Sequence, residues 1–397
     1  MKVALAINYD YHDYGGMLQA FATQRFLKQN GIDSDAINFD NVKGDISKRK
    51  WKYFMSNIFD LSIVKEKSRL IEKRLRQKCN QQLKAHMAER NAAFDEFCKS
   101  HFKVSHAFAS WADMSLASQK EYDAVIVGSD QLWLPSNVKA DYYTLNWVPD
   151  NVKKIAYATS FGIGAIPDKY KEAYTHYLTR INYLSARETS GQEIIKQLTG
   201  RDVPLVNDPA LLLDANGWNE VVDKEPLIKE KYVFCYFMGN NPDQREFVKR
   251  LAKKKGLKIV ALLHLDQYIA SDEVYVDMAP WHVSPADFVN FVKNAECVCT
   301  DSFHGTVFSI LYSRTFYTFK RFNKKASLST NTRITSLLGK LGLMDRLVSD
   351  MNICPDDSLD WQDIQERVSE FRKSSSEYLI NAIKAQFKTS VATSHPC

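Results

Sequence analysis

The sequence lacks the patterns that are typical of membrane-spanning, fibrous and secreted proteins. No stretch approaches the ~18 uninterrupted apolar residues of a membrane-spanning helix. Glycine and proline are sparse, at 15 and 11 residues in 397, which excludes collagen-like and low-complexity chains. The first residues, from Met1 to Asn8, turn polar too early for a signal peptide. We therefore expect a cytoplasmic protein.

The sequence also lacks a cysteine framework. Its seven cysteines are odd in number and widely scattered, in a chain too long to need disulfide bonds for stability. Cys297 and Cys299 stand one residue apart in an apolar run, whereas zinc ribbons use paired cysteines about two to four residues apart. We therefore expect reduced, buried structural cysteines and no metal site.

Several common catalytic signatures are missing as well. The chain has no phosphate-binding loop of the nucleotide-hydrolase type, no G-x-S-x-G turn and no glycine-rich dinucleotide motif after its first predicted strand. The D-x-D sequence at 33–35 precedes a predicted strand instead of following one, which does not favour a metal-bound nucleotide. We expect no cofactor.

The apolar pattern that is present predicts alternating strands and helices. Apolar residues make up 45% of the chain, and the length suggests two domains. A strand at 3–7, a helix at 17–27 and a strand at 35–39 open the chain, an order that favours a parallel sheet. Further strands are predicted at 122–128, 154–160, 183–187 and 203–206 in the first half, and at 232–237, 257–263, 297–300 and 315–319 in the second.

This order predicts an α/β protein of two doubly wound, Rossmann-like domains that face each other across a cleft, as in B-type glycosyltransferases. The first domain is expected at 1–220, with a helical insertion at about 46–100 that contains no glycine or proline. The second is expected at 221–345. A helical extension at 346–397 is expected to pack back on the body of the protein.

The insertion is strongly basic. Residues 43–90 contain 14 lysines and arginines against 5 acidic residues, although the whole chain has a net charge of only +6. One interpretation is a solvated helical face. The other is a surface for an anionic partner, such as a membrane or the diphosphate of a lipid-linked sugar. Nucleic acid is not expected, because no recognised binding motif accompanies the basic segment.

The strongest local signal for a binding site is the sequence from Thr300 to Val307. A buried strand runs into a polar turn, which contains Ser302 and His304, and then into an apolar helix. Ligands bind at the carboxyl ends of strands in open α/β sheets, and a helix N-terminus attracts anions. His304 is therefore a candidate ligand for a phosphate or carboxylate, unless it only caps the turn.

Basic and polar residues also follow other predicted strands. Lys320 and Arg321 end the next strand, and Asn331 and Arg333 open the following helix. Arginine pairs bidentately with carboxylate and phosphate, so these cations suit a small trianionic ligand, although each could equally be a surface residue. In the first half, a predicted strand is followed by Asp130, Gln131 and Trp133. These residues could bind a sugar, or they could form a turn with a buried aromatic side chain.

The first predicted strand is followed by Asn8, Gly15 and Gly16, and we expect both loops to open on the same cleft.

Eight short motifs occur in an order that resembles the polysaccharide pyruvyltransferase family. Any one of these motifs is weak, but eight in the same order are hard to obtain by chance. They are 14–20, which includes Gln19, then 122–133, 160–162, 186–188, 208–212, 284–288, 301–305 and 331–333.

The resemblance implies a function. Family membership implies phosphoenolpyruvate as donor, bound on the side of the second domain, and a sugar acceptor in the same cleft, on the side of the first. The product would be a pyruvyl ketal on a hydroxyl pair. We expect the acceptor to be a polyprenyl-diphosphate-linked oligosaccharide in exopolysaccharide or capsule biosynthesis, and the enzyme to associate peripherally with the inner face of the plasma membrane.

The resemblance also implies roles for residues. His304 would act as general acid, Arg187 would bind the donor, and Asp130 would accept the proton of the sugar hydroxyl. The family often carries an arginine where this chain has Phe303, so Arg321 or Arg333 is expected to supply the cation. The other predicted substrate-binding residues are Asn8, Gly15, Gly16, Gln19, Gln131, Trp133, Ser302, Lys320 and Asn331.

Two other functions remain open from the sequence. One is a glycosyltransferase that uses a nucleotide-sugar, although no acidic residue between Gly239 and Ser284 is clearly placed to bind a ribose. The other is a non-catalytic glycan-binding protein, in which the basic insertion would be the functional surface.

Overall fold

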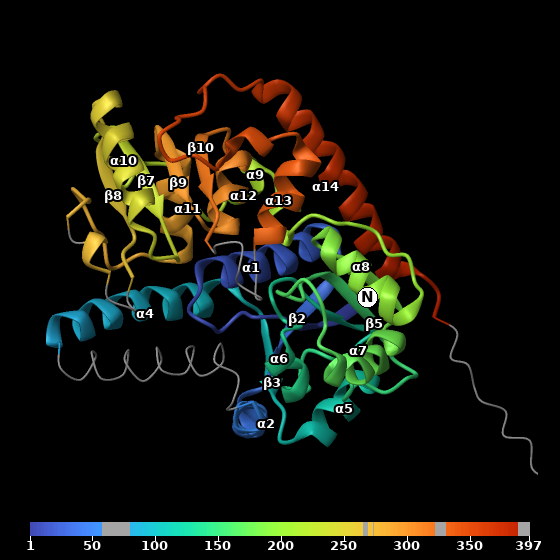
Figure 1. Cartoon of the computed structure of the whole chain (residues 1–397). Helices are drawn as coiled ribbons and strands as arrows, with labels where there is room; N and C mark the ends of the chain where they lie inside the picture. Colours follow the sequence, from blue (N-terminus) through green and yellow to red (C-terminus); the bar gives the residue numbers. More distant parts are fainter. Residues whose placement is uncertain (58–79, 265–268, 273, 322–330, 388–397) are drawn as a thin grey trace, which may run out of the picture.

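The computed structural model describes residues 1–57, 80–264, 269–272, 274–321 and 331–387. It contains two parallel β-sheets, which lie one above the other in Figure 1 and are each flanked by helices. The first sheet has the strand order β3-β2-β1-β4-β5-β6, and the second has the order β11-β10-β9-β7-β8. The predicted pair of doubly wound domains, similar in architecture to B-type glycosyltransferases, is therefore confirmed.

The central strands of the first sheet are short and buried. All residues of β4 and β5 are buried, as expected for parallel strands covered by helices on both faces. The predicted strand at 203–206 forms only a single bridge, between Ala186 and Leu205. The strands are β1 (Lys2–Ala6), β2 (Asp33–Asn38), β3 (Val104–Ala107), β4 (Ala124–Val127), β5 (Lys153–Thr159) and β6 (Tyr183–Ala186).

The helices of the first half include the predicted insertion. Two long helices, α2 and α4, flank residues 58–79, which lie outside the described part of the chain. Strand β3 follows the insertion, and sequence reasoning missed it because three of its four residues are exposed. The helices are α1 (Tyr14–Gln29), α2 (Lys43–Ser56), α4 (Gln81–His101), α5 (Trp111–Lys120), α6 (Pro135–Ala140), α7 (Asp168–Arg180) and α8 (Thr189–Thr199), with the 3₁₀ turn η1 (Asp40–Val42).

The second sheet repeats the alternation of strand and helix. Cys297 and Cys299 are buried in its central strand, which confirms the prediction of structural cysteines and raises the pKa of both thiols. Its strands are β7 (Tyr232–Tyr236), β8 (Lys258–Ala261), β9 (Cys297–Thr300), β10 (Thr315–Phe319) and β11 (Leu347–Val348), and its helices are α10 (Pro242–Lys255), α11 (Pro285–Asn294), α12 (Phe303–Leu311) and α13 (Asn331–Leu341). The remaining turns are η2 (Pro209–Leu211), α9 (Ala215–Trp218), η3 (Ala270–Asp272) and η4 (Met344–Arg346).

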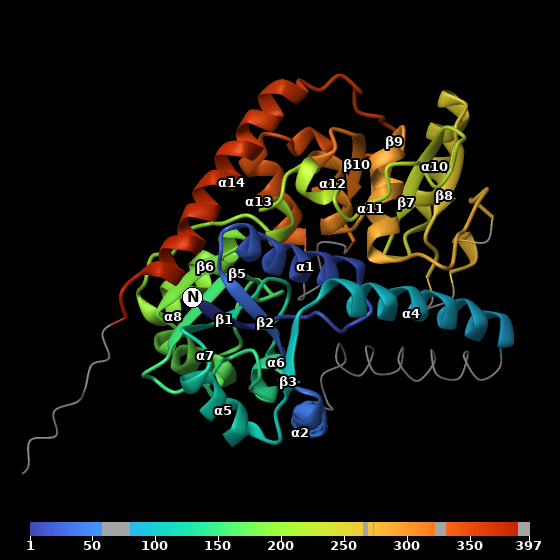
Figure 2. The ribbon, with the colours of Figure 1, turned by 180° about the vertical axis from the view of Figure 1, so that it is seen from behind.

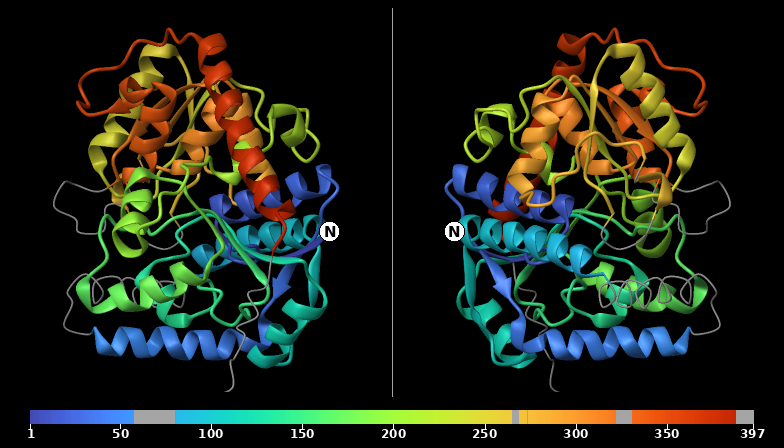
Figure 3. Two further views of the ribbon diagram at one scale, coloured as in Figure 1. Left: turned by 90° about the vertical axis from the view of Figure 1, so that its right-hand side faces the viewer. Right: turned by 90° about the vertical axis from the view of Figure 1, so that its left-hand side faces the viewer.

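The last helix, α14 (Trp361–Lys384), runs along the outside of both halves (Figures 2 and 3). At its start, the Gln365 side chain donates to the carbonyl of Ile310 in the second half, at 2.7 Å. At its end, the Lys153 ammonium of β5 donates to the carbonyls of Ile383 and Ala385, at 2.6 Å each. The helix thus ties the two sheets together.

No helix in the described ranges is long and apolar enough to cross a membrane.

Candidate functional site

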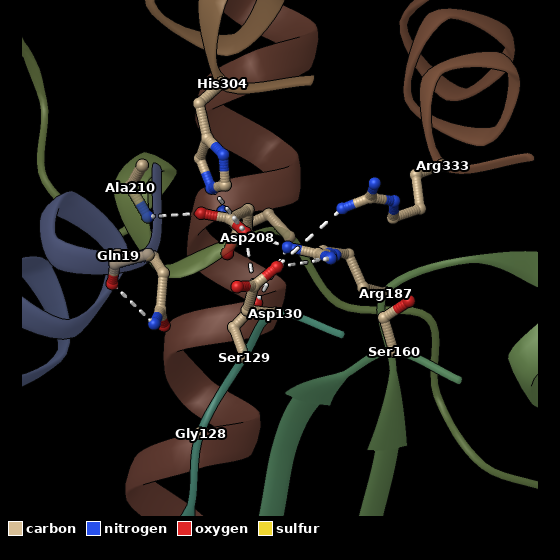
Figure 4. A network of polar contacts seen from close by, with 12 residues as sticks. Gln19, Gly128, Ser129, Asp130, Ser160, Arg187, Asp208, Ala210, His304 and Arg333 are labelled. Atoms are coloured by element: carbon tan, nitrogen blue, oxygen red, sulfur yellow. Dashed lines mark hydrogen bonds and ion pairs between the residues drawn. The ribbon is translucent and has the colours of Figure 1, made fainter. Parts of the chain in front are cut away.

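A polar cluster lies where the carboxyl ends of the two sheets face each other (Figure 4). The first half contributes Ser129 and Asp130 after β4, Arg187 after β6, and Asp208 just before η2. The second half contributes His304 from the first turn of α12, and Arg333 from α13. The structure therefore brings together the predicted residues Asp130, Arg187, His304 and Arg333.

Asp208 is the centre of this cluster. Its Oδ2 lies 2.6 Å from Nη1 of Arg187 and accepts a hydrogen bond from the Ser129 hydroxyl at 3.0 Å. Its Oδ1 accepts the backbone N–H of Ala210 at 2.9 Å. The Asp208 carboxylate is completely buried, so that each of these partners acts at low dielectric.

The electrostatic state of Asp208 follows from these partners. Burial by itself would raise the pKa of this carboxyl, but His304, Arg187 and the Ala210 N–H together hold it well below its usual range. Asp208 is therefore a carboxylate at neutral pH. Its charge compensates the buried Arg187 guanidinium, whose side chain is 1% exposed.

His304 reaches this cluster because the opposing helix carries a glycine. Nε2 of His304 lies 3.6 Å from Oδ2 of Asp208, too far for a hydrogen bond but close enough for a charge interaction. A Cβ atom on Gly15 would lie 1.9 Å from Nδ1 of His304. Any side chain at Gly15 would therefore displace the imidazole. Ser302 caps α12, since its hydroxyl accepts the N–H of Gly305 at 3.4 Å.

Asp130 holds two arginines in place. Its Oδ1 lies 3.9 Å from Nη2 of Arg187 and 3.8 Å from Nη1 of Arg333. The residue has φ of 83°, a conformation that costs energy without a glycine, and its carbonyl accepts the N–H groups of Leu132 and Ser160. Those two hydrogen bonds hold the strained turn and aim the carboxylate at the cluster.

Phe303 lies between the same two arginines. The centre of its ring is 4.7 Å from Cζ of Arg187 and 5.7 Å from Cζ of Arg333, so both guanidinium groups contact the aromatic ring. Burial and the neighbouring charge of Arg187 lower the pKa of Arg333 to about 10. Of the two predicted substitutes for the missing arginine, Arg333 thus lies directly beside Phe303.

The other predicted substitute, Arg321, lies against Asp301. Nη2 of Arg321 donates to the Asp301 carbonyl at 3.2 Å. The Asp301 carboxylate accepts the N–H groups of Met238 and Gly239, at 2.7 and 2.8 Å. Asp13, at the N-cap of α1, lies nearby: burial and Asp130 raise its pKa, while His304 and Arg321 act in the opposite direction.

Several buried nitrogen atoms of the cluster have no hydrogen-bond partner among the described residues. They are Nε and Nη2 of Arg187, Nε of Arg333 and Nε2 of His304. Leaving a buried polar group unpaired costs about 1–3 kcal/mol, and more for a charged group. Unpaired donors around one point are what an oxyanion ligand would satisfy.

The structure does not bring every predicted residue to the cluster. Trp133 is fully buried in the first half, where its indole N–H donates to the Tyr143 carbonyl at 3.0 Å and its ring packs against Phe161, so it cannot stack on a sugar in this arrangement. The Lys320 side chain is exposed, and that of Asn331 lies outside the described part. Gln131 is half-buried beside Gly162.

Two further predicted residues support α1 instead of reaching the cluster directly. The side-chain amide of Gln19 donates to the Gly16 carbonyl at 2.8 Å, and Asn8 lies against Gly16. Gly16 in turn donates its N–H to the Asp13 carboxylate at 2.7 Å. These residues shape the turn that carries Gly15.

Sequence reasoning missed Asp208, Asp13 and Glu188 as site residues. Glu188 accepts a hydrogen bond from the Ser160 hydroxyl at 2.7 Å, and burial raises its pKa. Asp208 lies two residues after the apolar segment 203–206 and precedes a proline, and that position just beyond a predicted strand was the available signal. Asp13 has the residue type of a helix N-cap.

Fold and cluster together define a class: a two-sheet α/β protein with buried cationic side chains clustered between the facing strand ends. A family model described as "Polysaccharide pyruvyl transferase" matches residues 13–321. The chain belongs to this family of transferases, as the motifs predicted.

Other similarities are more distant. A segment of 115 residues is 30% identical to a Candida albicans protein named Ataxin-10 homolog, over 28% of this chain and 22% of that protein's length. A structure of S. aureus MnaA with UDP has a TM-score of 0.49 at 11% identity and covers 96% of this chain and 95% of its own. A structure of E. coli heptosyltransferase WaaC has a TM-score of 0.37 at 13% identity, with 85% and 99% covered.

The buried ion pair predicts a specific effect on stability. Asp208→Asn should lower the free energy of unfolding at pH 7 by about 3–5 kcal/mol, because it removes the closest counter-charge of the buried Arg187 and leaves only Asp130 and Glu188, each 3.9 Å away. The folded-state pKa of Asp208 lies below its unfolded value, so its contribution is present above about pH 4 and is lost as the pH falls through the folded pKa. Urea unfolding from pH 7 to pH 2 should show a shallower acid loss for the variant than for the wild type.

The control for this measurement is Asp202→Asn, at an exposed aspartate that pairs with Lys196 on the surface. This variant should change the stability by no more than about 0.5 kcal/mol. Equal effects of the two substitutions would contradict the central role of Asp208.

Proposed function

We propose that the protein transfers the pyruvyl group of phosphoenolpyruvate to two hydroxyl groups of a sugar, which it joins as a ketal. One observation carries this proposal: two buried guanidinium groups, of Arg187 and Arg333, keep unpaired nitrogen atoms beside the unpaired Nε2 of His304. Phosphoenolpyruvate combines a carboxylate and a phosphate, and arginine is the side chain best suited to both.

His304 is the general acid of the proposed reaction. It transfers a proton from Nε2 to the methylene carbon of phosphoenolpyruvate, which places positive charge on the carbon that carries the phosphate. The first sugar hydroxyl adds to that carbon and gives up its proton to Asp130. Asp208 places a negative charge 3.6 Å from this nitrogen atom, which keeps the imidazole within the cluster while its N–H remains available to the substrate.

Loss of phosphate completes the exchange. The bond between carbon and phosphate oxygen breaks, and the departing phosphate takes the proton held by Asp130. The second hydroxyl then adds to the same carbon and gives its proton to His304, so that the products are inorganic phosphate and the pyruvyl ketal and both side chains regain their starting states. Arg187 and Arg333 stabilise the charge that develops on the departing phosphate. Arg321 supplies further positive charge from the side of the second sheet. The scheme uses neither a metal nor a cofactor.

The acceptor in this proposal is a polyprenyl-diphosphate-linked oligosaccharide, used in exopolysaccharide or capsule biosynthesis at the cytoplasmic face of the membrane. Helix α2 supports a peripheral contact with anionic lipid, because it has no buried residue. Its Trp51 is 57% exposed and its Lys48 side chain 79%. Tryptophan and lysine on one exposed helix suit the interface between headgroups and water.

The general acid can be tested directly. His304→Asn should keep the fold but reduce phosphate release from phosphoenolpyruvate, in the presence of a lipid-linked oligosaccharide pool, by about 10²-fold or more. Mass analysis of the pool should show the pyruvyl ketal with the wild-type enzyme and little or none with His304→Asn. His176→Asn, at an exposed histidine on α7, is the matched control and should keep full activity. Full activity of the His304 variant would remove this residue from the mechanism.

Donor binding can be tested by thermal unfolding. Phosphoenolpyruvate should raise the unfolding temperature of the wild type, because a ligand that binds only the folded state stabilises it. Arg333→Gln should weaken that binding about tenfold, since a hydrogen bond to a charged group contributes about 1.5–3 kcal/mol. Arg250→Gln, on the surface of α10, should bind as the wild type does. Stabilisation by nucleotide-sugars instead would favour a glycosyltransferase, and stabilisation by glycans alone a binding protein.

The membrane contact depends on exposed charge. Reversal of Lys48 and Lys52 to glutamate should release the protein from anionic liposomes in a sedimentation assay, without loss of turnover on a short soluble acceptor. Wild-type binding should fade with added salt, because the screening length is only about 8 Å at physiological ionic strength. Lys229→Glu with Lys253→Glu, on the second half, is the control of equal charge. A wild type that ignores liposomes at low salt contradicts this part of the proposal.

A further inference from the structure

Helix α4 connects the first half of the chain to the second. It contacts α11 of the second half, and in Figure 1 it runs beneath that half. One of its buried side chains, Arg90, crosses this boundary: Nη1 donates to the carbonyl of Leu263, just after β8, at 3.2 Å.

The other two guanidinium nitrogen atoms of Arg90 have no hydrogen-bond partner among the described residues. The residue is only 9% exposed, yet Nε and Nη2 have no hydrogen-bond partner, and no carboxylate pairs with this arginine within the described ranges. The buried Arg187 and Arg245 each contact an aspartate. A buried cation without an anion is costly, so its presence points to a counter-charge that a ligand brings.

The unpaired atoms form one recognition edge. Nε and Nη2 are adjacent on the planar guanidinium, and together they can donate two parallel hydrogen bonds to two oxygens of one phosphate or carboxylate. His264, the residue after Leu263, adds a second buried atom without a partner, its Nε2, while its Nδ1 contacts Asp272 at 2.8 Å. Arg90 and the residue that follows its hydrogen-bond partner Leu263 thus both carry unpaired polar atoms.

Aromatic rings hold Arg90 in place. Its Cζ lies 5.6 Å from the ring centre of Trp281, and the ring of His86, one turn earlier on α4, stacks on Trp281 at 4.1 Å with an angle of 6° between the planes. The guanidinium is thus fixed by the Leu263 carbonyl and by Trp281. Such pre-ordering reduces the entropy cost of binding a ligand.

Arg90 does not belong to the proposed donor site, but it lies near residues that contact both halves of the chain. Tyr14 donates to the Val283 carbonyl at 3.1 Å and contacts Tyr236 edge to face. Burial raises the pKa of Tyr236, and both Arg90 and Arg321 act against that rise, so both cations are near this phenol. Arg90 and Arg321 are therefore both close to Tyr236, and Arg90 belongs to α4, which contributes no residue to the cluster around Asp208.

We propose that Arg90 and Trp281 form a subsite for an oxyanion of the acceptor, which is the diphosphate that links the glycan to its carrier. The assignment to the acceptor rests on the proposed function, whereas the binding of an oxyanion at Arg90 does not. The subsite places the charged linkage at the α4 edge, away from Arg187 and Arg333, so that the glycan extends from there toward His304.

The test is calorimetric titration of the full chain with hexyl diphosphate in the presence of saturating phosphoenolpyruvate. The wild type should bind the probe, Arg90→Gln should weaken binding about tenfold or more, and Arg90→Lys should lie between them because it keeps the charge but loses the planar edge. The affinity for phosphoenolpyruvate should not change in either variant. Lys84→Gln, an exposed cation on the same helix, is the matched control and should bind as the wild type does.

Three outcomes would overturn the proposal: no binding of hexyl diphosphate to the wild type, equal binding by Arg90→Gln, or an equal loss of phosphoenolpyruvate affinity. If Arg90→Gln does not fold, the wild type and Arg90→Lys decide between these outcomes. If a glucuronic acid glycoside binds in an Arg90-dependent manner and hexyl diphosphate does not, Arg90 binds a carboxylate. The oxyanion subsite then stands, and its assignment to a diphosphate is wrong. If hexyl diphosphate binds in an Arg90-dependent manner but the wild type releases no phosphate from phosphoenolpyruvate with the lipid-linked oligosaccharide pool, the proposed function is wrong and the subsite stands.

Discussion

The buried ion pair between Arg187 and Asp208 is the interaction on which the rest of the site depends. Removing two charges from water costs several kcal/mol for each, and only close partners offset that cost. Asp208 obtains them from Arg187, Ser129 and the Ala210 N–H. Those partners come from the ends of β6 and β4 and from η2, so a single carboxylate sets the spacing of three segments.

The same carboxylate determines how closely the two halves approach. His304 belongs to the second sheet, yet its Nε2 lies 3.6 Å from Asp208. Its imidazole fits only because Gly15, on α1 of the first half, has no side chain there. Helix α14 binds both halves from outside, through Gln365 and Lys153, and α4 adds Arg90. The geometry of the site is therefore a property of the contact between the sheets.

Phe303 shows how the chain accommodates a departure from its family pattern. An aromatic ring replaces the expected arginine, and the guanidinium groups of Arg187 and Arg333 both lie against it. The ring excludes water from one side of each cation, which strengthens their interaction with an anion. Burial, together with the like charge of Arg187, lowers the pKa of Arg333 to about 10, so a bound trianion would offset both effects.

The sequence by itself determined the two parallel sheets, the helices on either side of residues 58–79, and the burial of Cys297 and Cys299, because burial and strand order follow from local patterns of apolar residues. The family was predicted from eight short motifs in order, and the matching family model confirms it. The sequence also placed Asp130, Arg187, His304 and Arg333 at the ends of strands or starts of helices. Only the tertiary structure decided that Asp208 contacts both Arg187 and His304, that Trp133 belongs to the core, and that Arg90 is buried with no carboxylate partner among the described residues. Such pairings join segments up to 173 residues apart, and their geometry arises only when the two halves pack together.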